Sequence, residues 1–334
     1  MQHSKGFETF LRDTVNLSQA KLNILDNRVD AIYSALKADP ELGPLVLGKK
    51  RQGSWAQRTI INPVGESEFD ADFMLHLSEV SEWANSPKTY IEKVYAALHR
   101  HSVYSDMPHH RKCRCVQLRY ANSMHVDIVP HLHLKDGREV IVNRDENRWE
   151  TTNPAGFTAW MQKKDNIADG NLRKVIRLMK YLRNHRNSFT GTRSIILTTL
   201  LGERVSETKA VSEPGCYGNV PTALLTIIED LDTWLQGRPF KPSIPDPSGS
   251  GVTFDHRWDQ ETYAYFRDRI HTHARQIREA YDEPDYDRSV RLWRSLFGGA
   301  FPNVPRPTTS VSSTAKFTSP LLITTSTSRT GRAG

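Results

Sequence analysis

The sequence predicts an α+β fold in which a mixed lobe, built around a β-sheet, precedes a mainly helical second lobe. Residues 69–77 and 124–134 alternate apolar and polar side chains, which is the period-two pattern of half-buried strands. After Asn153-Pro154, apolar side chains instead recur at helical spacing through several long segments. A chain of 334 residues is long enough for two closely packed lobes of this kind.

The elements of the first lobe, residues 1–150, follow from local patterns and stop signals. We predict a long or broken helix over 7–37, a strand over 69–77, a helix up to about residue 101, and strands over 113–120, 124–134 and 139–142. Asp39-Pro40 ends the first helix, because a proline ring cannot continue it. Asn85-Ser86-Pro87 supplies a cap and a first-turn proline for the second helix, and Asp136-Gly137 predicts a hairpin turn.

The second lobe, residues 151–302, is expected to be mainly helical. Helices are predicted over 155–164, 170–187, 194–203, 221–236, 259–282 and 285–297. Segments 205–219 and 237–253 are rich in loop-forming residues, so we expect both to be surface loops. Residues 303–334 contain 14 Ser or Thr and three Pro, and we predict a disordered tail because little apolar surface is present to offset its ordering entropy.

Composition and charge exclude several classes of protein. Apolar residues make up 37 % of the chain, which rules out wholesale disorder, and no run approaches the roughly 18 apolar residues of a membrane span. The three cysteines fit reduced thiols, so we expect a cytoplasmic protein. The net charge is +7, but the four basic residues of the predicted tail leave only +3 for the body. We therefore expect no extended nucleic-acid surface and a strictly local anion site.

Two carboxylates share one face of the strand predicted over 69–77. Because side chains alternate, Asp70 and Asp72 lie on the same face while Ala71 and Phe73 point into the core. Like charges this close repel each other, so a site that keeps both ionised favours a divalent cation, and hard oxygen ligands select Mg²⁺ or Mn²⁺. The alternative is an exposed edge strand whose two acids are simply solvated.

A third carboxylate and a glycine turn complete the pattern. Asp127 stands between β-branched apolar neighbours, where an acid without a partner is unfavourable. If its strand lies beside that of the first two acids, all three meet in a two-metal arrangement. Gln52, Gly53 and Ser54 form a turn with a hydroxyl and bare backbone N–H groups that can cradle a triphosphate. The alternatives are that Asp127 has a purely structural role and that Gln52–Ser54 is an ordinary turn without a ligand.

These motifs together resemble those of the nucleotidyltransferase superfamily that contains poly(A) polymerases, oligoadenylate synthases and cyclic GMP-AMP synthase. The shared pattern is Gly-Ser, then Asp-x-Asp, then a third Asp, carried here by QGSWAQRTIINPVGESEFDADFMLHL and MHVDIVP. Within the superfamily the chain is most similar to the bacterial CD-NTases, the cyclic-oligonucleotide synthases of antiphage CBASS operons. The similarity covers most of residues 1–302, including WETTNPAGFTAWM, RKVIRLMKYLRNH and VRLWRSLFGGAFP.

The resemblance implies a polymerase-β-like catalytic core within residues 1–150 and assigns roles by position. Asp70, Asp72 and Asp127 would bind two Mg²⁺ or Mn²⁺ ions, with Asp127 also acting as the base toward the attacking ribose hydroxyl. The Gln52–Ser54 turn would hold the donor phosphates. In-line attack at an α-phosphorus would release pyrophosphate, and a second round would close the ring.

Two further residues enter through the resemblance. Lys180 matches the family's triphosphate-binding lysine and shares a helix face with Arg173 and Arg177. A solvated basic face is the alternative for that helix. Ser194 matches a family serine near the same phosphates, although a plain N-cap explains it equally well.

Histidines and cysteines are weaker candidates. Five of them crowd a short segment, but Cys-x-Cys on a strand is poor spacing for structural zinc, so we expect no zinc at His101, His109, His110, Cys113 and Cys115. Three more alternate along the Asp127 strand, and we expect packing or solvent-facing roles for His125, His131 and His133.

The chain ends in Ser-Arg-Thr-Gly-Arg-Ala-Gly. Some CD-NTases resemble ubiquitin in having a C-terminal Gly or Ala that an E1/E2-like partner conjugates to targets. We therefore hypothesise that Gly334 is a conjugation end; a flexible tail with a small last residue is the alternative.

The leading hypothesis is a metal-dependent synthase that makes a cyclic di- or trinucleotide from NTPs in antiviral signalling. One alternative is a template-independent RNA-tailing enzyme with the same metal site, against which the low charge of the body weighs. The other is a catalytically silent nucleotide-binding scaffold, against which the presence of all three acids weighs.

Overall fold

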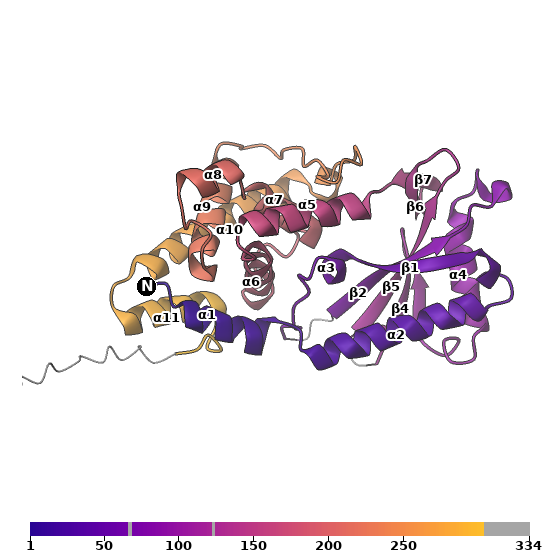
Figure 1. Cartoon of the computed structure of the whole chain (residues 1–334), viewed down its shortest axis with the longest axis horizontal. Coiled ribbons are helices and arrows are strands. Elements are labelled where there is room, and N and C mark those ends of the chain that lie inside the picture. The colour runs from indigo at the N-terminus through magenta and orange to yellow at the C-terminus, as the bar shows by residue number, and fades with distance from the viewer. Residues whose placement is uncertain (66–68, 122–123, 304–334) are drawn as a thin grey trace, which may run out of the picture. The chain divides into compact units, whose positions relative to one another are not determined.

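Two hydrophobic cores organise the chain in the computed structural model, which describes residues 1–65, 69–121 and 124–303. One core lies between a β-sheet and two helices, and the other is enclosed by helices (Figure 1). The predicted α+β class is therefore confirmed. The division into lobes at residues 150 and 302 stays a prediction, and the predicted tail with Gly334 lies outside the described residues.

The sheet is mixed, and its strands follow the order β1-β2-β5-β4-β3, with β6 and β7 continuing from β5. The strands are β1 (Val46–Gln52), β2 (Phe69–Leu77), β3 (His109–Arg111), β4 (Val116–Tyr120), β5 (Met124–His133), β6 (Glu139–Asn143) and β7 (Arg148–Thr151). β5 pairs in parallel with β2 along one edge, and antiparallel with β4 and then β6 along the other. Strands β1, β3 and β7 were not predicted. β3 and β7 have only three or four residues, too few alternations to show a period, and the sequence of β1, VLGKKRQ, hides its alternation behind a run of basic residues.

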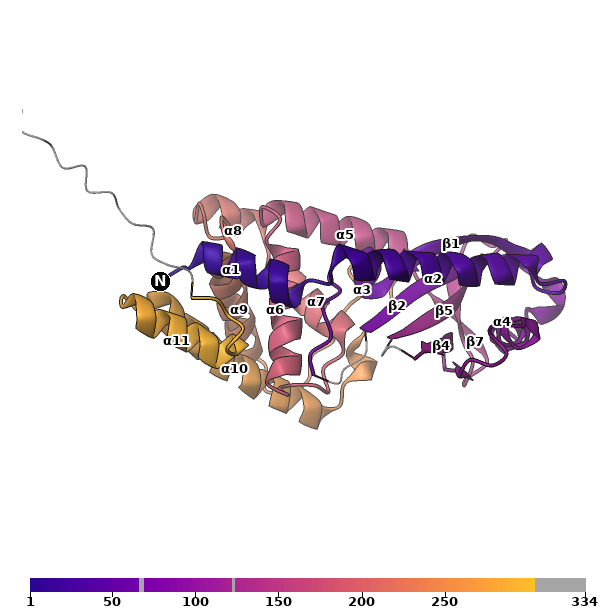
Figure 2. The ribbon, with the colours of Figure 1, turned by 90° about the horizontal axis from the view of Figure 1, so that it is seen from below.

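One face of the sheet is covered by α2 (Gln19–Ala38) and α4 (Lys88–Arg100), and Figure 2 shows α2 running along it. Ala71, Phe73 and Leu75 of β2 are fully buried in this core. Alternation therefore turns the residues between them toward the opposite face.

The predicted helix over 7–37 is broken. It consists of α1 (Ser4–Phe10), a π-helical turn (Leu11–Val15) and α2, separated by extended backbone at Asn16. Ser18 caps α2, since its side chain accepts from the backbone N–H of Lys21. The break lets α1 join the second core, where the ring of Phe7 packs edge-on against Trp293.

The second core is enclosed mainly by the helices that follow the sheet. They are α5 (Pro154–Ile167), α6 (Leu172–His185), α7 (Ser194–Glu203), α8 (Glu207–Ser212), α9 (Val220–Gln236), α10 (Gln260–Asp282) and α11 (Tyr286–Phe297). Short helical elements lie at α3 (Gly53–Ala56), Gly43–Leu45, Ser81–Trp83 and Asp255–Arg257. The prediction of a loop over 205–219 is wrong at α8, where the chain is helical. That helix buries none of its residues, so it shows no apolar periodicity, but Ser206 caps it.

A buried ion pair connects the helical core to the turn after β1. Arg173 of α6 donates to the Asp165 carboxylate of α5 (2.5 Å) and to the carbonyl oxygen of Gln57 (2.9 Å). Among the helices that the structure describes, none combines the length and the apolar character needed to span a bilayer.

Candidate active site

The parallel pairing of β2 with β5 brings three carboxylates to one patch of the sheet. Asp72 is paired with Asp127 across the two strands, and Asp70 is paired with His125 two residues earlier. Neighbouring strands are about 4.8 Å apart, and residues two apart on one strand are about 6.6 Å apart. The strands carrying the three acids are thus neighbours, as the two-metal hypothesis requires.

The three acids repel one another in a partly buried setting. Burial, followed by the charges of Asp70 and Asp127, raises the pKa of Asp72 to about 8. Burial also raises the pKa of Asp127, although a hydrogen bond from Gln117 Nε2 to its Oδ1 (3.1 Å) lowers it. A divalent cation would offset this repulsion, and a donor set made of carboxylate oxygens fits Mg²⁺ or Mn²⁺.

Gly53 lies directly against the Asp72 carboxylate. β1 pairs with β2 so that Gln52 is opposite Asp72, and the chain then turns at Gly53 into α3. Gly53 has a φ of +59°, and a Cβ there would lie 2.2 Å from Asp72 Oδ2. Glycine is needed both for this backbone conformation and for the close approach.

The Gln52–Ser54 segment therefore lies beside the acids, as a strand end and the first turn of a helix. Gln52 also carries a buried Oε1 that has no hydrogen-bond partner within the described ranges. Ser54 is partly buried, and its carbonyl oxygen accepts from the backbone N–H of Thr59. The turn is held by its own backbone hydrogen bonds.

Helix α6 presents basic side chains to the acids from the helical side. Lys180 is only 5 % exposed, and its Nζ donates to the carbonyl oxygen of Thr59 (3.1 Å). Burial lowers the pKa of Lys180 to about 8, against the opposing effect of the carboxylates of Asp70 and Asp72. The solvated-face alternative is therefore wrong for Lys180. Burial likewise lowers the pKa of Arg177, one turn earlier.

Arg183 is the basic residue of this patch that sequence reasoning missed. Burial lowers its pKa, while the charge of Asp70 raises it. Its Nη1 donates to the carbonyl oxygen of Thr192 (3.0 Å) and to Ser194 Oγ (3.4 Å). The signal that could have found it is its spacing of three residues from Lys180, which places both on one helix face.

Ser194 is connected to the acids through Arg183, which donates to Ser194 Oγ and feels the charge of Asp70. Ser194 is the first residue of α7, whose N-cap is Arg193, and the Arg193 side chain makes no capping hydrogen bond. The plain N-cap interpretation of Ser194 is therefore wrong. The alternative role near phosphates stays a prediction.

The histidines and cysteines of residues 101–115 have separate partners. Cys113 Sγ donates to Asn143 Oδ1 (3.3 Å), whereas Cys115 is buried beside Asp127. The ring of His109 packs against Tyr95, with centroids 4.7 Å apart. On β5, the strand that carries Asp127, His131 and His133 lie close to His76 of β2.

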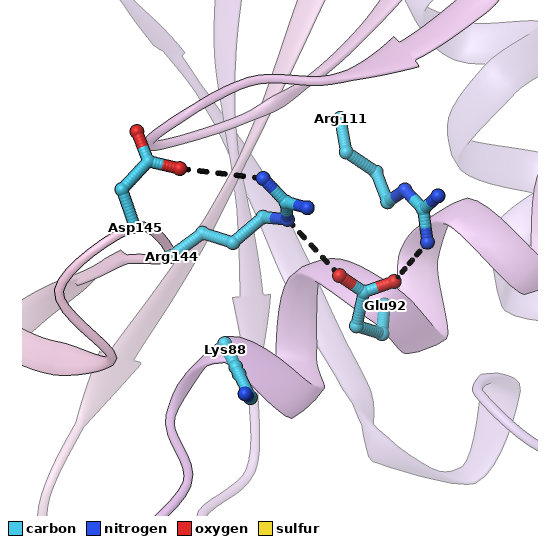
Figure 3. Close-up of a pocket in the computed structure, with 5 residues that line it drawn as sticks. All are labelled: Lys88, Glu92, Arg111, Arg144 and Asp145. Carbon is cyan, nitrogen blue, oxygen red and sulfur yellow. Dashed lines mark hydrogen bonds and ion pairs between the residues drawn. The ribbon is translucent and has the colours of Figure 1, made fainter.

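A cavity of about 500 Å³ lies beside α4, two of whose residues line it (Figure 3). Its lining residues are Lys88, Glu92, Arg111, Arg144 and Asp145. Glu92 accepts from Arg111 (2.5 Å) and from Arg144 (3.0 Å), so much of the positive charge is already paired. The acid patch is therefore the better candidate for phosphate chemistry.

Comparison with known families finds a match over the first part of the chain. Residues 1–165 match a family model described as the Second Messenger Oligonucleotide or Dinucleotide Synthetase domain, SMODS. This segment contains β1, β2 and β5, and with them all three acids and the Gln52–Ser54 segment.

Two curated relatives align along most of the chain. A c-di-GMP synthase of Roseivirga ehrenbergii is 24 % identical over 321 residues, covering 86 % of this chain and 82 % of the relative. A cyclic AMP-AMP-AMP synthase of an Acinetobacter species is 22 % identical over 307 residues, covering 90 % of this chain and 86 % of the relative.

Solved structures share the fold. The GTP-bound cyclic AMP-GMP synthase DncV of Vibrio cholerae aligns with a TM-score of 0.72 at 15 % identity, covering 90 % of this chain and 96 % of that one. CdnC of E. coli MS115-1 with ATP aligns with a TM-score of 0.66 at 18 % identity, covering 90 % and 98 %. The nucleotidyltransferase fold expected from the sequence is confirmed.

Proposed function

Since the chain is a CD-NTase-like nucleotidyltransferase with an SMODS domain over residues 1–165, we propose that it converts NTPs into a cyclic di- or trinucleotide second messenger. We further propose that this messenger acts in bacterial antiphage defence and is made in the cytoplasm. The observation that carries the proposal is the pairing of Asp72 with Asp127, beside a glycine that the Asp72 carboxylate touches.

In this proposal the three acids hold the cations. Two Mg²⁺ or Mn²⁺ ions bound by Asp70, Asp72 and Asp127 would activate the ribose hydroxyl and stabilise the departing pyrophosphate. The raised pKa values of Asp72 and Asp127 support this assignment, because carboxylates that repel one another gain most from a shared cation.

The residues around the acids position the nucleotide. Backbone N–H groups at Gly53 and Ser54 would donate to the donor phosphates, and the Lys180 ammonium would pair with the triphosphate charge. Asp127 would accept the proton of the attacking ribose hydroxyl. The hydroxyl oxygen then bonds to the α-phosphorus, the bond from that phosphorus to the bridging oxygen breaks, and pyrophosphate leaves. A second round on the linear product closes the ring.

The experiment that tests this function uses purified protein with all four labelled NTPs and Mg²⁺ or Mn²⁺. All four are needed because the two relatives above are named for different products. We expect a phosphatase-resistant product, identified by mass spectrometry, that Asp70→Asn/Asp72→Asn does not make. Labelled linear oligonucleotides in place of a resistant product would support the tailing alternative instead. Nucleotide binding without turnover, in the presence of either metal, would support the silent scaffold.

A further inference from the structure

Beyond the acid patch, the sheet carries a second group of metal-binding side chains. His76 of β2, with His131 and His133 of β5, offer ligand atoms that all lie within 4.8 Å of one another. The ring centroids of the three imidazoles are 5.0 to 5.4 Å apart. Small side-chain rotations would bring one nitrogen of each ring to the same metal ion.

Strand register builds this group, just as it builds the acid patch. His76 is paired with His131 across β2 and β5, and His133 follows two residues later on the same face. Glu139 of β6 is paired with His133 across the other edge of β5. The group lies four residues beyond Asp72 and Asp127 on their strands, which is about 13 Å. It is therefore separate from the acids.

The hydrogen bonding of His131 leaves one nitrogen for a ligand. Its Nε2 lies 2.7 Å from Glu139 Oε1, whereas its Nδ1 is buried and has no hydrogen-bond partner in the described part of the chain. A buried polar atom without a partner is costly. Histidines that bind metals commonly hold a carboxylate with one ring nitrogen and the ion with the other.

The protonation state of the rings also suits an ion. Burial lowers the pKa of His131 to about 4. The pKa of His76 is lowered by burial, then by the neighbouring His133 and Lys50. Both rings are therefore neutral near pH 7, which is the form that coordinates metals. The half-exposed His133 provides an entry path from solvent.

We propose that His76, His131 and His133 bind a Zn²⁺ ion, with the carboxylate of Glu139 orienting the ring of His131. Three imidazoles, with water as the fourth ligand, are a donor set that zinc accepts, whereas Mg²⁺ prefers oxygen ligands throughout. The ion ties β2 to β5, the two strands that carry the acids. It thereby stabilises the register on which the acid patch depends.

The test is metal binding by the chain without a histidine tag, after metals have been removed with EDTA. Co²⁺ serves as the probe in excess Mg²⁺, because its visible spectrum distinguishes tetrahedral nitrogen ligation from octahedral oxygen ligation. We expect one Co²⁺ per chain with a tetrahedral spectrum, displaced by one equivalent of Zn²⁺. A purely octahedral spectrum would overturn the proposal.

Single substitutions identify which side chains bind the ion. His133→Gln changes a half-exposed residue, so the fold is preserved, and it should abolish the tetrahedral spectrum. Glu139→Gln should weaken Zn²⁺ binding about 10- to 100-fold. His110→Gln, on exposed β3, is the matched control and should bind like the wild type. Asp70→Asn/Asp72→Asn should keep the spectrum. A spectrum that survives His133→Gln, or that is lost with the two acids, would refute a histidine site.

Discussion

Gly53→Ala tests whether the contact between the β1–α3 turn and Asp72 is needed for catalysis. An alanine at the φ of +59° occupies the left-handed region, which costs about 1–2 kcal/mol. Its Cβ would also lie 2.2 Å from Asp72 Oδ2, far inside any real contact, so the carboxylate must turn away. The first penalty affects stability, and the second displaces one of the three acids.

Gly65→Ala separates the two penalties. Gly65 has a φ of +63°, and a Cβ there would meet no atom of the described structure within 4 Å. This variant should lose about 1–2 kcal/mol of unfolding free energy and keep its activity. Gly53→Ala should lose at least as much stability, and its kcat should fall by about 10²-fold, the effect expected when a catalytic group moves by roughly 1 Å.

The assays are initial rates of pyrophosphate release at saturating NTP and Mg²⁺, and urea unfolding of both variants. The reasoning is refuted if Gly53→Ala retains the wild-type kcat. It is also refuted if both variants lose kcat equally, because backbone strain rather than the Asp72 contact would then be the cause.

Three further predictions concern the same region. Asp127→Asn should lower kcat about 10²- to 10⁴-fold, the usual contribution of a general base, and an unchanged rate of pyrophosphate release would exclude Asp127 from the chemistry. Without divalent ions, the free energy of unfolding should fall as the pH rises from about 4 to about 8, because Asp72 holds its proton up to a pKa of about 8 only in the folded state. Urea unfolding measures this slope, and a slope unchanged in Asp72→Asn would contradict the assignment. Asp165→Ala should cost about 3–5 kcal/mol of unfolding free energy, because it leaves the Arg173 guanidinium buried without its partner; a loss below about 1 kcal/mol in urea would show that the pair is no more than a surface ion pair.

Local sequence patterns were sufficient to predict most helices and strands and to identify the carboxylates. Alternation over residues 69–77 placed Asp70 and Asp72 on one face, and the structure has β2 over those same residues. The glycine turn was also visible, because Gly53-Ser54 offers a glycine and a hydroxyl shortly before the acids. Local sequence patterns could not predict which strands are neighbours in the sheet. The meeting of Asp72 with Asp127 depends on the parallel pairing of β2 and β5.

The failures have the same physical origin. α8 buries no side chain, so it has no apolar period to detect, and the cap of α7 falls on Arg193 rather than Ser194. Arg183 was not singled out, because a charge on an amphipathic helix is ordinary and only the tertiary structure brings it to Asp70. His131 and His133 alternate along one strand, but nothing local connects them to His76, more than fifty residues earlier.

The sequence by itself determined which side chains share a face, because alternation along a strand and spacing along a helix are set by backbone geometry within a few residues. It thus specified two acids on one face, a glycine turn before them and a basic helix face. Tertiary structure alone decided which faces meet. Strand order and register are set by packing of the whole sheet, and they bring Asp127 to Asp72, Lys180 to the acids, and His76 to His131 and His133.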